Sequence, residues 1–299
     1  MPLPLHVLAA LGTAACWAVT GLISADAVRA LGAFHFNLIR QGFFIAVLVL
    51  IVVTTGGWAG QTLHTMAILA ASGITGLLIG DTLLFAAVGR MGPRRAGAVF
   101  ALNAPIAALL GWFMLGEALP VQAVVGICIA AAGVAVAILG RPRADALWLE
   151  TVQGVLLTGL LFGLGAAFGQ AAGIMMARPV MAAGIDLYLA LLFRLGASGL
   201  VMGLLAATAF APPRPVELSR SALILTAISA TLGLLVGMTL FLCALQGSQT
   251  GIIATLSATS PVTILPLLWL RTGQRPSALG FAGAALAVAG LGWIFLRQT

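Results

Sequence analysis

Three ionisable side chains stand deep inside long apolar stretches of the sequence: Arg40, Asp81 and Arg194. If these stretches are transmembrane helices, each charge is costly and needs a partner or a function. At 1.5 Å of rise per residue, Asp81 lies roughly 13 Å and Arg40 roughly 10 Å from the same membrane face. We therefore expect a buried Arg40–Asp81 ion pair, which either braces two helices or serves as a gate or a proton-coupling carboxylate.

Arg194 occupies the position in the second half of the chain that matches Arg40 in the first half. Its acidic partner is missing, because Met238 stands where Asp81 would be matched. An arginine without an acid can cap backbone carbonyls, extend to the membrane interface or bind an anionic group. Both a structural role and the binding of a substrate carboxylate stay open for Arg194.

Two proline motifs stand at matching positions of the halves, Asn103-Ala104-Pro105 and Ser257-Ala258-Thr259-Ser260-Pro261. Proline frees a backbone carbonyl about one turn earlier, and in lipid such groups must be satisfied by neighbours or line a cavity. The motifs indicate either satisfied kinks or a central binding site. The polar candidates for contact with a substrate are Asn103, Gln170, Ser257 and Thr259. Aromatic rings near mid-span either pack between helices or hold an apolar group in a pocket; they are Trp17, Phe85, Phe100, Phe168 and Phe241.

Several enzyme chemistries lack the residues that they need. Without any Lys, the chain can form neither a GxxxxGK[ST] phosphate loop nor a Lys Schiff base. The string Gly196-Ala197-Ser198-Gly199 resembles the GxSG motif of rhomboid-type intramembrane proteases, but the three histidines lie near the ends of apolar runs. The three cysteines show no metal-ligand spacing. We expect no catalytic residue, no metal and no cofactor.

The composition indicates that lipid covers most of the surface, because 62% of the residues are hydrophobic and only 7% are charged. The 14 basic residues are scattered between apolar runs, which favours anchoring at a membrane face over nucleic-acid binding. Turn residues and charges divide the chain into ten apolar spans, each close to the length that crosses a bilayer. The predicted spans are residues 5–24, 34–54, 64–88, 94–115, 120–140, 152–177, 184–209, 220–245, 249–270 and 276–297.

The spans divide into two similar five-helix halves, residues 1–143 and 144–299. Since each half has an odd number of spans, the second half must enter the membrane from the opposite side, as an inverted repeat. Inverted repeats can exchange roles around one central cavity, which favours a transporter. The residues that we align between the halves are Trp17 with Phe168, Arg40 with Arg194, Gly76 with Gly233, Gly80 with Gly237, and Pro105 with Pro261.

A resemblance to a known family rests on the stretch Leu115-Gly116-Glu117-Ala118-Leu119-Pro120, which is followed by Gln122, Gly126 and Gly133. This stretch resembles the signature at the fourth-to-fifth helix junction of EamA-type transporters, which belong to the drug/metabolite transporter superfamily. The second half departs from the pattern, because Gly273 or a neighbour stands where the first half has its glutamate. Any role of that acid is therefore not duplicated.

Trp17 in the first span and Arg40 in the second fit the same pattern. Together with the two five-helix halves, the resemblance covers essentially the whole chain. It is closest to the members that export amino acids and related metabolites. The resemblance implies a secondary transporter that moves small metabolites, such as amino acids with aromatic or other apolar side chains. We expect a monomer that works by alternating access in a bacterial inner membrane. The alternative of a different class is a membrane-embedded enzyme or a lipid-handling protein.

The arginines between the spans are distributed unevenly over the two membrane faces. Ten lie on one face and two on the other, and the positive-inside rule places the richer face in the cytoplasm. Both chain termini would then face the periplasm. The richer face carries Arg29, Arg90, Arg94, Arg95, Arg141, Arg143, Arg214, Arg220, Arg271 and Arg275.

Overall fold

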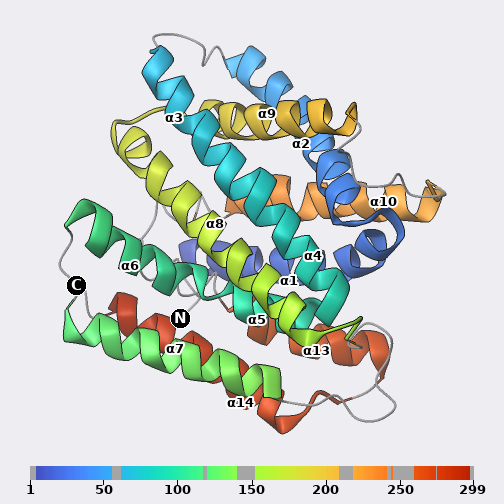
Figure 1. Ribbon diagram of the computed structural model, residues 1–299, viewed down its shortest axis with the longest axis vertical. Coiled ribbons are helices and arrows are strands. Elements are labelled where there is room, and N and C mark those ends of the chain that lie inside the picture. The colour runs from blue at the N-terminus through green and yellow to red at the C-terminus, as the bar shows by residue number, and fades with distance from the viewer. Residues whose placement is uncertain are drawn as a thin grey trace.

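The computed structural model describes residues 5–55, 62–116, 120–139, 152–208, 218–240, 244, 259–273 and 275–296, and within these ranges the chain is helical and contains no strand (Figure 1). The helices of the first half are α1 (Leu5–Leu31), α2 (Ala33–Thr55), α3 (Leu63–Gly73), the π-helix η1 (Ile74–Gly80), α4 (Asp81–Met91), α5 (Pro93–Phe100), α6 (Asn103–Leu115) and α7 (Val121–Leu139). Those of the second half are α8 (Leu156–Ala182), α9 (Leu187–Ala206), α10 (Arg220–Ser229), the π-helix η3 (Ala230–Val236), α13 (Ser260–Thr272) and α14 (Ala278–Leu296).

Seven helical segments in the described part of the chain are long and apolar enough to cross a membrane. They are Leu5–Leu31, Ala33–Thr54, Leu63–Met91, Pro93–Met114, Leu156–Met181, Leu187–Ala206 and Arg220–Leu240. Three shorter apolar helices follow the same pattern, namely Val124–Ala137, Val262–Thr272 and Ala278–Gly290. Each of these segments falls on a predicted span, and the protein is an all-helical, multi-pass membrane protein.

The helix ends follow local capping chemistry. Thr62, Asp186 and Ser219 precede α3, α9 and α10, and each side chain accepts a hydrogen bond from the backbone N–H three residues later. At the other end, α6 and α13 both stop at a glycine in the left-handed conformation, Gly116 with φ of 64° and Gly273 with φ of 69°. These two glycines end corresponding helices of the two halves.

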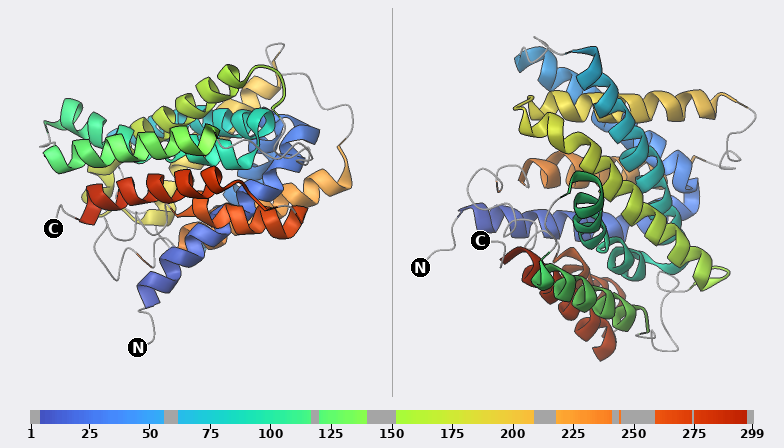
Figure 2. Two further views of the ribbon diagram at one scale, coloured as in Figure 1. Left: turned by 90° about the horizontal axis from the view of Figure 1, so that it is seen from below. Right: turned by 60° about the vertical axis from the view of Figure 1, so that its left-hand side comes forward.

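The last helices of the two halves, α7 and α14, pack backbone against backbone. A Cβ on Gly133 would lie 2.2 Å from the amide nitrogen of Ala287, and one on Gly290 would lie 2.4 Å from that of Ala130. Residue 133 of α7 meets residue 287 of α14, and residue 130 meets residue 290, so the residue numbers run in opposite directions and the two helices are antiparallel. They lie side by side in Figures 1 and 2. Small residues permit this close approach between membrane helices.

Helices of one half also pack on helices of the other. Ser24 of α1 shares a 3.1 Å hydrogen bond with Ser229 of α10. In the corresponding contact, Ser72 of α3 donates to the carbonyl of Gly173 of α8 at 2.6 Å. Both contacts belong to antiparallel helix pairs, α1 with α10 and α3 with α8 (Figures 1 and 2). The two halves are thus joined through a matching pair of buried hydrogen bonds.

Described arginines that were assigned to one membrane face do gather at one end of the helices. Arg271 pairs with Asp26, which joins the C-terminal ends of α13 and α1. Arg94 Nη1 donates to the Ala137 carbonyl at 2.8 Å and so joins the start of α5 to the end of α7. Arg178 lies at the far end, in the last turns of α8. Four arginines lie outside the described residues: Arg141, Arg143, Arg214 and Arg297.

Candidate functional site

The structure contains the buried ion pair that the sequence indicated. Arg40 Nη1 donates to Asp81 Oδ2 at 3.2 Å, joining α2 to the first residue of α4, and the two side chains are only 8% and 12% exposed. The ring of Phe85 lies one turn after Asp81, with its centroid 5.0 Å from Arg40 Cζ, and Phe36 meets this ring edge to face. Phe85, a predicted substrate contact, is therefore packed against the ion pair.

The π-helix η1 leads directly into Asp81 and exposes a backbone acceptor. The Asp81 N–H bonds back to the carbonyl of Gly76, so the carbonyl of Leu77 loses the donor that an α-helix would supply four residues later. Asn37 Nδ2 donates to this carbonyl at 2.9 Å and Gln41 Nε2 at 3.1 Å, both from α2. Two side chains of α2 thus satisfy the group that the π-helix frees, beside the ion pair.

The second half has a π-helix, η3, in the matching place. The Gly237 N–H bonds back to the carbonyl of Leu232, which frees the carbonyl of Gly233. Trp17 Nε1 of α1 donates to that carbonyl at 3.2 Å, and Thr13 Oγ1 donates to the Gly237 carbonyl at 3.3 Å. Trp17 is therefore bound to the centre of the opposite half. Single π-turns inside α-helices are rare and occur frequently at functional sites.

The packing against these π-helices identifies Gln170, not Phe168, as the counterpart of Trp17. A Cβ on Gly237 would lie 3.0 Å from Trp17 Nε1, and a Cβ on Gly80 would lie 3.2 Å from the backbone nitrogen of Gln170. Phe168 is 53% exposed on another face of α8. The alignment of Trp17 with Phe168 was wrong by two residues, because Phe168 lies on the exposed face of α8 and Gln170 on the face that meets η1. The exposed stripe of α8 that includes Phe168 also contains Leu157, Leu161 and Leu164.

Arg194 and Gln170 meet beside η1. The backbones of α3 and α9 are in contact, since a Cβ on Gly73 would lie 1.9 Å from the carbonyl oxygen of Arg194. Further along the same helix, a Cβ on Gly76 would lie 3.1 Å from Gln170 Oε1 and 3.4 Å from Arg194 Nη2. Gln170 Oε1 and the Nε and Nη2 atoms of Arg194 are buried and have no hydrogen-bond partner among the described residues. Arg194 is also within electrostatic range of Asp81.

The remaining predicted site residues take part in hydrogen bonds within their own helices or lie outside the described ranges. Asn103 Nδ2 donates to the carbonyl of Phe100 at 2.7 Å, so this amide satisfies its own helix at the junction of α5 and α6. The carbonyl of Thr259 accepts from Thr263 Oγ1 at 3.1 Å at the start of α13. The predicted residues outside the described ranges are Phe241 and Ser257. Substrate contact by Phe100, Asn103 and Thr259 stays a prediction.

Sequence reasoning missed the amide side chains that bind the freed carbonyl of η1. Asn37 and Gln41 stand one turn apart in an apolar span, and Asn37 also donates to Thr82 Oγ1 at 2.9 Å. Buried polar groups are almost always hydrogen-bonded, so two amides at i and i+4 next to Arg40 were a usable signal for a polar site. The π-helices themselves leave no recognisable pattern in the residues.

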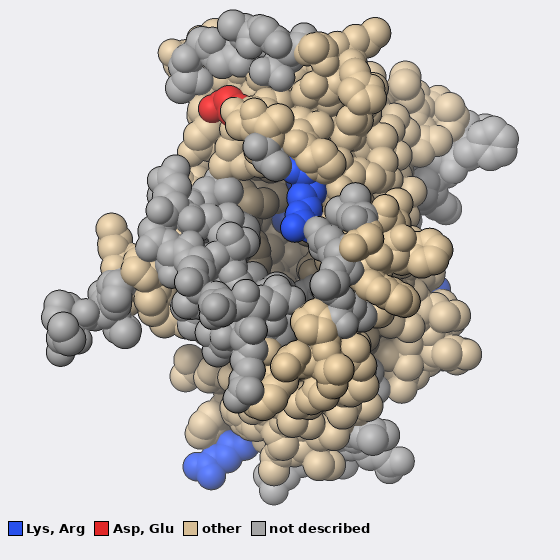
Figure 3. All heavy atoms as spheres, turned by 90° about the vertical axis from the view of Figure 1, so that its left-hand side faces the viewer, with Lys and Arg blue, Asp and Glu red and all other residues tan. Residues whose placement is uncertain are grey.

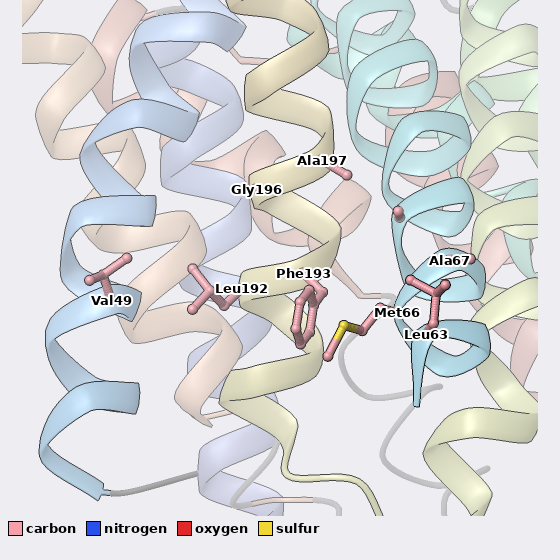
Figure 4. Close-up of a pocket in the computed structure, with 9 residues that line it drawn as sticks. Val49, Leu63, Met66, Ala67, Leu192, Phe193, Gly196 and Ala197 are labelled. Atoms are coloured by element: carbon pink, nitrogen blue, oxygen red, sulfur yellow. The ribbon is translucent and has the colours of Figure 1, made fainter. Parts of the chain in front are cut away.

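A pocket of about 490 Å³ lies between α2, α3 and α9, at a place that the sequence did not indicate. Figure 4 shows Phe193 of α9 extending toward Met66 of α3 within it. None of the predicted substrate-binding residues lines this pocket, which is almost wholly apolar. Figure 3 shows a face of the molecule that is hollowed near its centre, with basic side-chain atoms at the border of the hollow. The residues that line the apolar pocket are Val49, Leu63, Met66, Ala67, Ala70, Leu192, Phe193, Gly196 and Ala197.

No group of three or more His, Cys, Asp or Glu side chains comes together in the part of the chain that the structure describes. The site is instead made of one ion pair, one further buried arginine and amide side chains. The described part of the chain is thus a multi-pass helical protein with matching π-helices in its two halves and a buried ion pair beside one of them.

Comparison with known proteins agrees with this class. The sequence matches the EamA-like transporter family twice, over residues 4–139 and 157–296, and the chain belongs to this family. It is 29% identical over 120 residues to an uncharacterized transporter of Clostridium kluyveri, in a match that spans 40% of this chain and 39% of the relative. One solved crystal structure of another protein has the same fold as this chain, with a TM-score of 0.67 and 20% sequence identity. The match covers 97% of this chain and 96% of the chain in that structure. The predicted membership of the EamA-type transporters is confirmed at the level of the family.

Proposed function

We propose that the protein is a secondary carrier that moves amino acids, including those with aromatic or other apolar side chains, out of the cell across a bacterial inner membrane by alternating access. In this proposal the halves are inverted repeats, the carrier works as a monomer, and no catalytic step occurs. The observation that carries the proposal is the reciprocal packing of α1 on η3 and of α8 on η1. Each half thus inserts its first helix against the π-helix of the other half.

Such a pair of matching contacts is what alternating access requires. If the halves rock, one contact can open toward one side of the membrane while the other stays closed, and the roles can exchange. The antiparallel packing of α7 on α14 supports the inverted relation, because corresponding helices of inverted repeats run in opposite directions. The two contacts also differ in chemistry: Trp17 is hydrogen-bonded to η3, whereas the side-chain oxygen of Gln170 beside η1 has no partner among the described residues.

The Arg40–Asp81 pair is proposed as the control point of this movement. It joins α2 to α4 at the end of η1, so any separation of these helices must break a buried ion pair. A proton on Asp81 would weaken the pair by removing the negative charge, which would couple the opening of η1 to proton movement. Loss of the pair is therefore expected to change the coupling of transport as well as the stability of the fold.

The test is transport by the purified full-length chain in proteoliposomes, with a panel of labelled amino acids. The proposal predicts saturable uptake of at least one apolar or aromatic amino acid, and faster uptake when the same unlabelled amino acid is preloaded inside, which is counterflow. Protein-free liposomes are the control. Uptake that rises linearly without saturation would indicate a channel, and chemical conversion of the label would indicate an enzyme; either result contradicts the proposal.

A further inference from the structure

An ion pair between the two halves joins α1 to α13 at the end of the helices where the arginines gather. Arg271 Nη2 donates to Asp26 Oδ2, and Arg271 Nη1 donates to the backbone carbonyl of Leu22 at 3.1 Å. One guanidinium of the second half thus binds two acceptors that lie one turn apart on the first helix of the first half. Because one rigid guanidinium makes both contacts, α13 cannot move away from this end of α1 without breaking both.

From this ion pair toward the middle of the helices, α1 and α13 are packed together through apolar side chains. Leu22 of α1 lies in one buried cluster with Ile264 and Leu268 of α13. Met91, the last residue of α4, belongs to the same cluster. A Cβ on Gly21 would lie 3.6 Å from Ile264 Cδ1, which is ordinary van der Waals contact between the two helices. Packed side chains therefore close this end of the molecule beneath the ion pair.

The opposite side of the molecule differs in shape and in charge. Figure 3 views the side on which α1 begins and α14 ends in Figure 1, and this face is hollowed near its centre. The arginine of the ion pair also has no charged counterpart in the matching helix α6. Arg271 stands two residues before the capping glycine Gly273, whereas Met114 stands two residues before the capping glycine Gly116. The ion pair is thus a feature of one end of the carrier.

The exposure of the ion pair suits a contact that opens and closes repeatedly. The side chains of Arg271 and Asp26 are 33% and 20% exposed, whereas those of Arg40 and Asp81 are only 8% and 12% exposed. Water can solvate the separated charges of the exposed pair, so such a pair is far less costly to break than a buried one. The Asp26–Arg271 pair can therefore separate while the rest of the fold stays intact.

We propose that the Asp26–Arg271 pair is a latch that closes the arginine-rich end of the transport path and opens each time the path is exposed to that side. This inference rests on the proposed alternating access and names the contact that controls one of its two ends. Since α6 has no charged counterpart of Arg271, the latch stabilises one conformation of the carrier over the other. The carrier without substrate rests closed at this end, and breaking the latch shifts the population toward opening there.

The test is the labelling rate of a cysteine placed inside the latch, measured with a thiol-reactive fluorophore on the purified full-length chain in micelles. Ile264→Cys, in a chain whose three native cysteines are replaced, lies two turns from Arg271 toward the helix middle, at a position that is 4% exposed. We expect slow labelling while the latch is intact. Asp26→Asn and Arg271→Gln should each raise the rate about twofold to fivefold, the range that a partly exposed ion pair implies.

Reversing the two charges tests whether the pair itself is responsible. Asp26→Arg combined with Arg271→Asp restores opposite charges, and the combination should be labelled more slowly than either single variant. Arg275→Gln is the matched control, because Arg275 stacks on Trp269 at the same end, with its Cζ 5.0 Å from the ring centroid, and its loss should leave the rate unchanged.

A second reporter distinguishes a local opening from a general loosening of the fold. Leu69→Cys stands at a position of α3 that is 0% exposed and belongs to a different buried cluster, so it should stay protected in every latch variant. If the chain with Ile264→Cys fails to fold, Leu268→Cys, at a position that is 4% exposed one turn from Arg271, takes its place.

The outcomes separate the latch from the proposed function. If Asp26→Asn and Arg271→Gln leave the labelling at position 264 unchanged, the latch is overturned, and normal counterflow would leave the carrier standing. The latch is also overturned if the charge reversal is labelled faster than both single variants, or if position 69 becomes accessible together with position 264. If labelling follows the prediction but wild type shows no counterflow with any amino acid, the latch stands and the proposed amino acid carrier is overturned.

Discussion

Removing either partner of the Arg40–Asp81 pair should destabilise the protein strongly, and removing both should cost less than the sum of the two. Asp81→Asn leaves the guanidinium of Arg40 buried without its counter-charge, and Arg40→Gln does the same to Asp81. The pair is joined at 3.2 Å and its side chains are only 8% and 12% exposed, so little water is present to compensate. The structure thus predicts energetic coupling between the two substitutions.

The magnitude follows from the burial. Stranding one member of a buried ion pair typically costs about 3–5 kcal/mol. A direct estimate agrees, because two unit charges about 4 Å apart at an effective dielectric constant of roughly 20 attract each other by about 4 kcal/mol. Since the second substitution removes the stranded charge, the double variant should recover about 1–3 kcal/mol relative to additive behaviour.

The assay is a double-mutant cycle on the free energy of unfolding, measured by denaturation of the purified protein in mixed micelles. Arg178→Gln, at an exposed position, is the control for the loss of an arginine and should change stability by less than about 0.5 kcal/mol. Strictly additive losses in the cycle would show that the two side chains do not interact, and the account of the ion pair would then be refuted.

Further predictions concern helix packing, the second π-helix and topology. Gly73→Val should lower the folded yield in size-exclusion chromatography, because its Cβ would lie 1.9 Å from a carbonyl oxygen of α9. Gly196→Val is the control and should keep the wild-type yield, because no atom lies within 4 Å of the added Cβ. Equal yields of the two variants would contradict the close packing of α3 on α9. Trp17→Phe should cost about 1–3 kcal/mol in denaturation, because it strands the buried carbonyl of Gly233; an unchanged stability would show that this hydrogen bond contributes little. A reporter fused after Thr299 should read as periplasmic, and a cytoplasmic signal would overturn the orientation inferred from the arginines.

The sequence was informative wherever burial in lipid restricts the residue types. Apolar runs of nearly fixed length, interrupted by turn residues and arginines, predicted the spans, and each candidate span of the structure falls on one of them. The same reasoning predicted the Arg40–Asp81 pair, because the depths of two charges in neighbouring spans follow from the helical rise alone. The halves could be aligned because glycines at close helix contacts recur at equivalent places, such as Gly76 with Gly233 and Gly80 with Gly237.

What the sequence could not predict depends on which face of a helix a residue occupies. Phe168 was aligned with Trp17, but Phe168 lies on the exposed face of α8, and the structure brings Gln170 of the same helix against η1. The unpaired atoms of Gln170 and Arg194 meet only because α8 and α9 both pack on the segment around Gly76. Such a meeting point follows from tertiary packing, which periodicity within one helix does not contain.

The central claim, that the halves move against each other to carry substrate, can be tested most directly by locking the α1–η3 contact. A Cβ on Gly233 would lie 3.5 Å from Thr20 Cβ, within the range of about 3.5–4.5 Å that disulfides require. Thr20→Cys with Gly233→Cys, in a chain whose three native cysteines are replaced, should stop amino acid counterflow in proteoliposomes when oxidised and restore it when reduced. Oxidation of the cysteine-free chain is the control. If the fully cross-linked protein shows counterflow as fast as the same protein after chemical reduction of the disulfide, the account is contradicted.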